Sequence, residues 1–161
     1  KYLITGAGPV GRAVARELAS RGHECLIMSR HDTTVNLGPR VQNITGDATS
    51  KESYPANIDG IAHCIHAAYS AEQWRKLLIP AEETALRIAA ERTIPIVFPE
   101  SIYGFDPNCE EVSPTTPLTG SRHGKPGVRA QLIDTRLASR AHTISVIAAD
   151  LFGPDLSLIH I

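Results

Sequence analysis

The chain has 161 residues, of which 42% are hydrophobic, and this is enough for the core of one ordinary domain. Its 16 Lys and Arg residues nearly balance its 17 Asp and Glu residues, so it lacks the basic charge of a typical nucleic-acid-binding protein. Three widely spaced cysteines without a CxxC pair are typical of reduced thiols in a cytoplasmic protein. No apolar run is long enough to cross a bilayer, so we expect neither a nucleic acid nor a membrane as partner.

The first predicted elements form one βαβ unit. Residues 2–5 are a short apolar run that leads directly into a glycine-rich turn at residues 6–11. Apolar positions at helical spacing follow over residues 10–21, and Gly22 is placed to end that helix. A second apolar run of strand length, residues 25–28, completes the unit.

The rest of the chain continues the alternation of strands and helices. We expect strands at residues 41–44, 61–67, 94–98 and 143–149, and helices at 71–91 and 129–141. This order predicts an α/β domain with a doubly wound parallel sheet, the Rossmann fold. Residues 99–127 contain five prolines and four glycines, which predicts a long loop. Because this loop follows a strand, we expect it at the ligand-binding carboxyl edge of the sheet.

The glycine-rich turn fits the GxGxxG fingerprint of a dinucleotide site, in the strand–turn–helix context that the fingerprint requires. Gly6 would permit the tight turn, Gly8 the approach of a pyrophosphate, and Gly11 the close packing of helix on strand. The helix start at Pro9 and Val10 would direct free N–H groups at the phosphates. The alternative is a glycine turn that only packs an ordinary βαβ unit.

The residues after the second strand favour NADP as the cofactor. An NAD site usually has Asp or Glu about 20 residues after the fingerprint, to bind the ribose 2′-hydroxyl. Here Ser29 and Arg30 occupy that place, and Arg forms forked hydrogen bonds with phosphate. Two alternatives remain open: Arg30 is a solvated charge at a strand end, or the nearby Asp32 binds the ribose of NAD.

With these residues in place, the chain resembles the extended, atypical branch of the short-chain dehydrogenase/reductase superfamily, a group of NAD(P)-dependent epimerases, dehydratases and reductases. The resemblance covers residues 2–154 and depends on motifs in the family's order. They are ITGAGPVG at 4–11, GD at 46–47, AHCIHAAY at 62–69, SIYGFDP at 101–107, Glu111 before PTTPLTG, and LFGP at 151–154. The resemblance implies that Asp47 approaches the adenine and that Ala48 and Ala67 also contact the cofactor.

The chain departs from the family in its catalytic residues. The glycine motif TGAGPVG is one residue shorter than the usual spacing, as in atypical members. Counting from Pro117 in the family pattern PxxxYxxxK places Ser121 at the tyrosine position and Lys125 at the lysine position. The Ser or Thr partner, four residues before Tyr103, is replaced by Pro99. Two of the three groups that perform proton transfer in the family are therefore missing at their expected places.

Several residues are candidates for the missing chemistry. In active relatives a tyrosine, its pKa lowered by the lysine and the cofactor, exchanges a proton with the substrate. We consider Ser121, Ser101, Tyr103 and His123 as substitutes, and Tyr103 is the best chemical match. The alternatives are that Tyr103 is only the structural tyrosine of the family's YG turn and that His123 is an exposed loop residue. Lys125 could still bind the nicotinamide ribose without a tyrosine.

We predict no metal site. His63 and His66 flank Cys64, but on a strand these two histidines would point to opposite faces. Trp74, near the start of a predicted helix, is expected to serve packing.

Both ends of the chain are expected to be incomplete. The chain begins at Lys1 without a methionine and enters a strand at once. Residues 156–161, LSLIHI, are also the in-frame translation of CTGTCTCTTATACACATC, a transposase end sequence used as a sequencing adapter. We interpret them as read-through, the alternative being a chance hydrophobic hexapeptide. The natural part would be one NAD(P)-binding domain, residues 1–155, truncated at its carboxyl end.

The sequence thus predicts an oxidoreductase, epimerase or dehydratase that acts by hydride transfer on a nucleotide sugar or related carbonyl compound. The alternative is a catalytically silent dinucleotide-binding sensor or regulator. We expect a small-molecule substrate and consider a homodimer.

Overall fold

The computed structural model describes residues 1–31, 36–149 and 151. Within this part the chain alternates strands and helices, as expected from the sequence. The elements are β1 (Tyr2–Thr5), α1 (Pro9–Ser20), β2 (Cys25–Ser29), β3 (Val41–Thr45), η1 (Lys51–Ser53), β4 (Gly60–His63), α2 (Ala71–Arg92), β5 (Ile96–Ser101), η2 (Ile102–Gly104), α3 (Gly124–Ala138) and β6 (Thr143–Ala148). Asp32, most of the LFGP motif and residues 156–161 lie outside the described residues.

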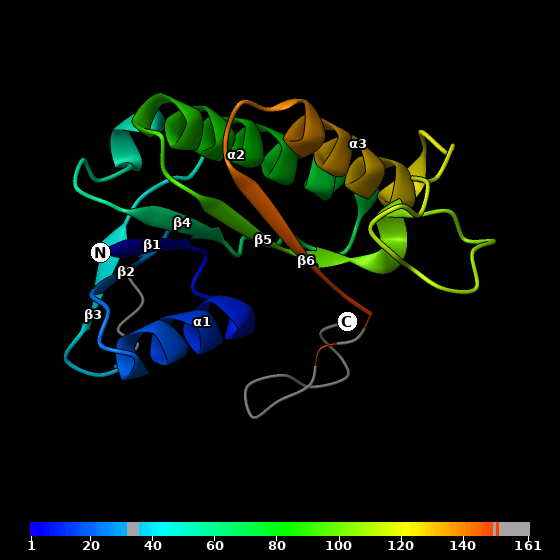
Figure 1. Cartoon of the computed structure of the whole chain (residues 1–161). Helices are drawn as coiled ribbons and strands as arrows, with labels where there is room; N and C mark the ends of the chain where they lie inside the picture. The colour runs from blue at the N-terminus through cyan, green and yellow to red at the C-terminus, as the bar shows by residue number, and fades with distance from the viewer. Residues whose placement is uncertain (32–35, 150, 152–161) are drawn as a thin grey trace.

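The six strands form one parallel sheet in the order β3-β2-β1-β4-β5-β6. Helix α1 covers one face of the sheet, and α2 and α3 lie side by side on the other (Figure 1). This arrangement confirms the predicted doubly wound Rossmann fold. The strand order reverses between β1 and β4, and such a switch point opens a ligand crevice at the carboxyl ends of the strands.

Strand β1 is buried on both faces, which explains its short, fully apolar run. Leu3 packs in the cluster that includes α2 and Phe98 of β5. Ile4 packs on the opposite side against Ala15 of α1 and Ile27 of β2. Each of these side chains is at most 1% exposed, so the two layers of core enclose the strand that precedes the glycine turn.

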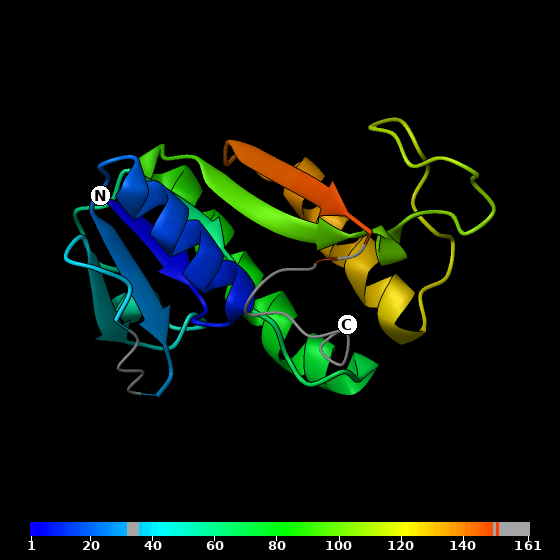
Figure 2. The same ribbon diagram turned by 90° about the horizontal axis from the view of Figure 1, so that it is seen from below.

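The structure moves several predicted boundaries near the carboxyl edge of the sheet. Strand β4 ends at His63, so residues 64–69 form an irregular segment there and not the second half of a strand. Strand β5 continues to Ser101, and α3 begins at Gly124, five residues earlier than expected. The loop that separates η2 from α3 extends away from the end of β5 (Figure 2). A backbone bridge between Phe105 and Leu118 connects the two sides of this loop. Lys125 therefore lies in the first turn of a helix.

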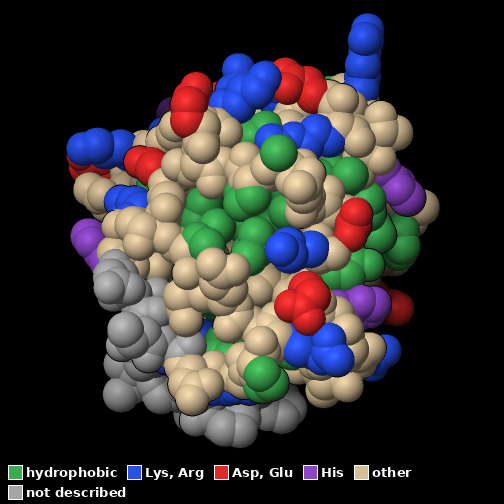
Figure 3. Space-filling model, turned by 90° about the vertical axis from the view of Figure 1, so that its left-hand side faces the viewer, with side chains coloured by type: hydrophobic (Ala, Val, Ile, Leu, Met, Phe, Trp, Pro, Cys, Tyr) green, Lys and Arg blue, Asp and Glu red, His purple; other side chains and the backbone are tan. Residues whose placement is uncertain are grey.

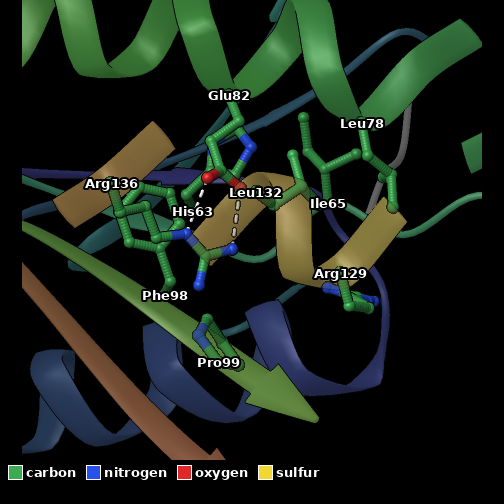
Figure 4. A pocket seen from close by; sticks show the side chains of 9 residues that line it. All are labelled: His63, Ile65, Leu78, Glu82, Phe98, Pro99, Arg129, Leu132 and Arg136. Carbon is green, nitrogen blue, oxygen red and sulfur yellow. Dashed lines mark hydrogen bonds and ion pairs between the residues drawn. The ribbon is translucent and has the colours of Figure 1, made fainter. Parts of the chain in front are cut away.

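A buried ion network holds α3 against α2 and β5 (Figure 4). Arg136 of α3 donates two hydrogen bonds to Glu82 of α2, with N–O distances of 2.6 and 2.8 Å, and lies 2.7 Å from Glu100 of β5. Burial raises the pKa of Glu82, and this effect is opposed by the bonds from Arg136. The cavity beside this network encloses about 10 Å³, no more than one water needs, so we assign it a structural role.

Charges of both signs are mixed on the face of the molecule that Figure 3 shows. Lys and Arg side chains lie there among Asp and Glu side chains and form no large patch of one sign. None of the helices in the described residues is both long and apolar enough to cross a membrane.

Candidate functional site

A crevice of about 230 Å³ lies at the switch point between β1 and β4. Segments at the carboxyl ends of four strands line most of it: the glycine turn after β1, the end of β2, and the residues after β3 and β4. The lining residues fall in the ranges 6–8, 28–31, 46–48 and 64–66, with Leu77 of α2. The structure thus brings together Gly6, Gly8, Ser29, Arg30, Asp47 and Ala48, all of which the sequence analysis selected as cofactor contacts.

The glycines of the turn differ in what they do for the fold. A Cβ atom on Gly11 would lie 1.9 Å from the backbone oxygen of Gly6, and one on Gly6 would lie 2.7 Å from the backbone oxygen of Cys64. Both positions therefore need glycine for packing, and Gly6 also has a φ of 99°. Around Gly8, a Cβ would meet nothing within 4 Å. The fold does not need glycine there, so the free space beside Gly8 is available to a ligand.

The amino end of α1 faces this space. Gly8 is the N-cap residue, and no side chain forms a capping hydrogen bond there. Pro9 and Val10 are the first residues of the helix, as predicted. An uncapped helix start presents unpaired N–H groups and a partial positive charge, which suits a phosphate.

The opposite part of the crevice combines a guanidinium with a carboxylate. Asp47 accepts hydrogen bonds of 2.9 Å from the backbone N–H and the hydroxyl of Thr49. These bonds, and to a lesser degree the charge of Arg30, hold the pKa of Asp47 below its usual value. Ser29 donates a hydrogen bond to the backbone oxygen of His31. Asp47 is therefore an anion beside Arg30 at neutral pH, and both groups remain at the crevice wall.

The predicted catalytic residues are only partly brought together. The hydroxyl of Ser121 accepts a bond from the backbone N–H of His123, the N-cap residue of α3, at 3.3 Å. Ser121 therefore orders the start of this helix. Lys125 and Tyr103 instead meet at a residue that the sequence analysis missed, Tyr69. The two tyrosine hydroxyl oxygens are 2.8 Å apart and hydrogen-bonded, and the Lys125 Nζ lies 2.9 Å from the centroid of the Tyr69 ring.

Packed rings connect this group to the crevice. Trp74 is 1% exposed, and its ring lies 5.5 Å from that of His66, a crevice residue. The same indole contacts the rings of Tyr69 at 5.7 Å and Tyr103 at 6.5 Å, measured between centroids. Ala67 packs in the cluster around Trp74. Trp74 thus has the packing role expected for it, and it positions the residues on either side.

His63, the last residue of β4, and Cys64, which directly follows it, have structural surroundings. His63 is 6% exposed and shares a 2.9 Å hydrogen bond with the Thr5 hydroxyl. Burial, and secondarily the charge of Arg136, lower the pKa of His63 to about 3, while burial raises the pKa of Cys64 to about 12. Among the described residues, no group of three or more His, Cys, Asp or Glu side chains is arranged to hold a metal ion.

Fold and crevice together define a Rossmann domain of the dinucleotide-binding type. Residues 2–155 match the family described as the NAD dependent epimerase/dehydratase family. The chain belongs to this family, a part of the extended short-chain dehydrogenase/reductases. A comparison with curated protein sequences gave no match.

Solved structures support the same fold. The Bordetella bronchiseptica enzyme WbmG, in complex with NAD and UDP, is similar with a TM-score of 0.78 and 16% identity, over 98% of this chain and 55% of WbmG. The dTDP-glucose 4,6-dehydratase of Bacillus anthracis, in complex with NAD, has a TM-score of 0.74 and 16% identity, over 96% of this chain and 56% of the enzyme. A UDP-galactose 4-epimerase has a TM-score of 0.73 and 18% identity, over 96% of this chain and 58% of the epimerase. The chain therefore spans little more than half the length of these proteins.

Proposed function

We propose that the protein binds a nicotinamide dinucleotide, with NADP preferred, and catalyses hydride transfer on a carbonyl compound such as a nucleotide sugar. The observation that carries this proposal is the crevice at the β1/β4 switch point, where the open space at Gly8 adjoins the uncapped start of α1. Family membership supports it, as do the NAD and UDP in the complex with WbmG.

The residues of the crevice fit the parts of such a cofactor. The space beside Gly8 and the N–H groups of α1 suit the pyrophosphate. Asp47 and Ala48 would lie against the adenine, and Arg30 with Ser29 would bind a ribose 2′-phosphate. Glycine at position 8 suits this cofactor, since a side chain there would fill the space that the phosphates require.

The chemical step would occur beyond the other end of the crevice. A bound nicotinamide dinucleotide supplies or accepts a hydride at its nicotinamide ring. Lys125 would hold the nicotinamide ribose, and Ala67, which packs beside Trp74, would limit the space next to it. The buried Trp74 excludes water from that side of the site. Charge at Lys125 would also favour the ionised form of a nearby acid.

Cofactor binding tests the proposal. Replacing Arg30 with Ala should weaken NADPH binding by about 1–3 kcal/mol, the range for hydrogen bonds to charged groups, and leave NADH binding nearly unchanged. Arg21→Ala, which removes an exposed side chain beyond the far end of α1, is the matched control and should affect neither cofactor. Equal losses for NADPH and NADH would refute the NADP preference, and no binding of either would refute the proposal. Tight cofactor binding without turnover on a panel of carbonyl compounds and nucleotide sugars would favour the alternative, a catalytically silent dinucleotide-binding sensor or regulator.

A further inference from the structure

We propose that Tyr69 is the proton-exchanging residue of this protein, with Tyr103 and Lys125 as its partners, in place of the tyrosine that Ser121 replaces. This inference rests on the proposed function, because the proton exchange accompanies hydride transfer. It assigns the acid to a different element from the one that the family motif predicts.

Three segments that meet at the carboxyl edge of the sheet bring these side chains together. Tyr69 lies after β4, Tyr103 lies in η2 directly after β5, and Lys125 lies in the first turn of α3. The hydroxyl oxygens of Tyr69 and Tyr103 are 2.8 Å apart, and the Lys125 Nζ lies 2.9 Å from the centre of the Tyr69 ring. Tyr69 is the central member because it contacts both of the others.

Exposure and position distinguish Tyr69 from Tyr54 and Tyr2. Tyr69 is 51% exposed, so its side chain lies open to the solvent at this edge of the sheet. Tyr54 is 4% exposed, and its hydroxyl donates a hydrogen bond to the backbone oxygen of Ala48. Tyr2 lies at the amino end of β1, at the opposite edge of the sheet. Ser121 is held at the start of α3 by its bonds with His123.

The surroundings of Tyr69 favour its ionised form. The hydrogen bond with Tyr103, followed by the neighbouring Lys125, lowers the pKa of Tyr69 from its ordinary value. The packing partner Trp74 also contacts His66 and Arg129, and the Arg129 guanidinium lies over the indole at 4.7 Å from its centroid. Burial lowers the pKa of His66, and Arg129 is ion-paired with Glu100 at 3.3 Å, so Lys125 is the charge that stabilises a phenolate at Tyr69.

The cluster lies where the reactive end of a cofactor would reach. The crevice begins at β2 and crosses β1 to residues 64–66 after β4. Tyr69 is three residues further along the same segment, and Trp74 connects His66 with Tyr69. A dinucleotide with its adenine near Asp47 and its pyrophosphate beside Gly8 would extend toward this cluster.

In the reductive direction, Tyr69 would donate its phenolic proton to the carbonyl oxygen, and a bound reduced dinucleotide would supply the hydride for the carbonyl carbon. The new C–H and O–H bonds would convert the carbonyl into an alcohol and leave the dinucleotide oxidised. Tyr103 and Lys125 stabilise the resulting Tyr69 phenolate, which regains its proton from water. Oxidation of an alcohol runs through the same residues in reverse.

Titration of the tyrosines tests the inference without any cofactor. We expect the ultraviolet absorbance of wild type to show one phenol that ionises below the ordinary value of about 10, and Tyr69→Phe to lack it. Lys125→Met and Tyr103→Phe should each shift this ionisation to higher pH. Tyr2→Phe and Lys76→Met, an exposed lysine of α2, are the matched controls and should leave it in place. A Tyr69 that ionises at or above the ordinary value would overturn the inference.

Turnover separates this inference from the proposed function. Tyr69→Phe should lower kcat by about 100-fold or more, the range for loss of a general acid or base, while its NADPH affinity stays within twofold of wild type. In Lys125→Met, the pH profile of kcat should shift to higher pH, as the ionisation of the Tyr69 phenol does. Wild-type kcat in Tyr69→Phe, with cofactor binding intact, would overturn the inference and leave the proposed function standing. Binding without turnover in wild type would overturn the inference too, and absence of cofactor binding would refute the proposed function itself.

Discussion

His63 should make the stability of this protein depend on pH. The side chain is buried beneath α2 and α3, packs against Phe98 and bonds to Thr5. Burial and the charge of Arg136 lower its pKa in the folded protein to about 3, against an unfolded value of 6.5. Because the folded state disfavours the protonated form, the stabilising effect is complete above pH 6.5 and is lost as the pH falls toward 3.

The size of the effect follows from the two pKa values of His63. At about pH 5 the imidazole is still neutral in the folded state. The unfolded imidazole is protonated there, because this pH lies about 1.5 units below its pKa of 6.5. Each unit corresponds to about 1.4 kcal/mol, so the free energy of unfolding should be about 2 kcal/mol lower at pH 5 than at pH 7.5 from this residue alone.

Urea denaturation of wild type and His63→Gln at both pH values isolates this contribution. The variant should be less stable at neutral pH because it loses the ring packing, but it should lose about 2 kcal/mol less than wild type on acidification. His142→Gln, an exposed histidine, serves as control and should retain the wild-type dependence. An identical pH dependence in wild type and His63→Gln would show that the imidazole is not held neutral by burial.

Two further predictions concern the glycine turn and the ion network. Gly11→Ala would place a methyl group against the backbone oxygen of Gly6 and should lower the free energy of unfolding by about 1–3 kcal/mol, whereas Gly8→Ala should leave stability within about 0.5 kcal/mol and weaken cofactor binding. Equal stability losses in the two variants would contradict this reasoning. Arg136→Met should destabilise the protein by about 3–5 kcal/mol in urea denaturation, because it leaves the carboxylate of Glu82 buried without its partner, and a loss below about 1 kcal/mol would refute this.

Local sequence patterns were sufficient for the fold and for much of the candidate crevice. Apolar runs of strand length mark strands that are buried on both faces, such as β1 with Leu3 and Ile4. The GxGxxG pattern places the turn and α1, because Gly6 has a positive φ of 99° and Gly11 packs against the backbone oxygen of Gly6 within the same turn. Arg30 could be assigned to the crevice from its spacing after the glycine fingerprint, and Asp47 from the GD motif of the family that the chain resembles.

Only the tertiary structure decided which distant side chains meet. Tyr69 is the last residue of the AHCIHAAY motif, and its place at the carboxyl edge was the one available signal for it. Its contacts with Tyr103 and Lys125 depend on the adjacency of β4 and β5 and on the early start of α3. The pairing of Arg136 with Glu82 across 54 residues likewise depends on α2 and α3 packing on the same face. Strand order and helix packing result from burial over the whole chain, so local spacing predicts the elements but not these contacts.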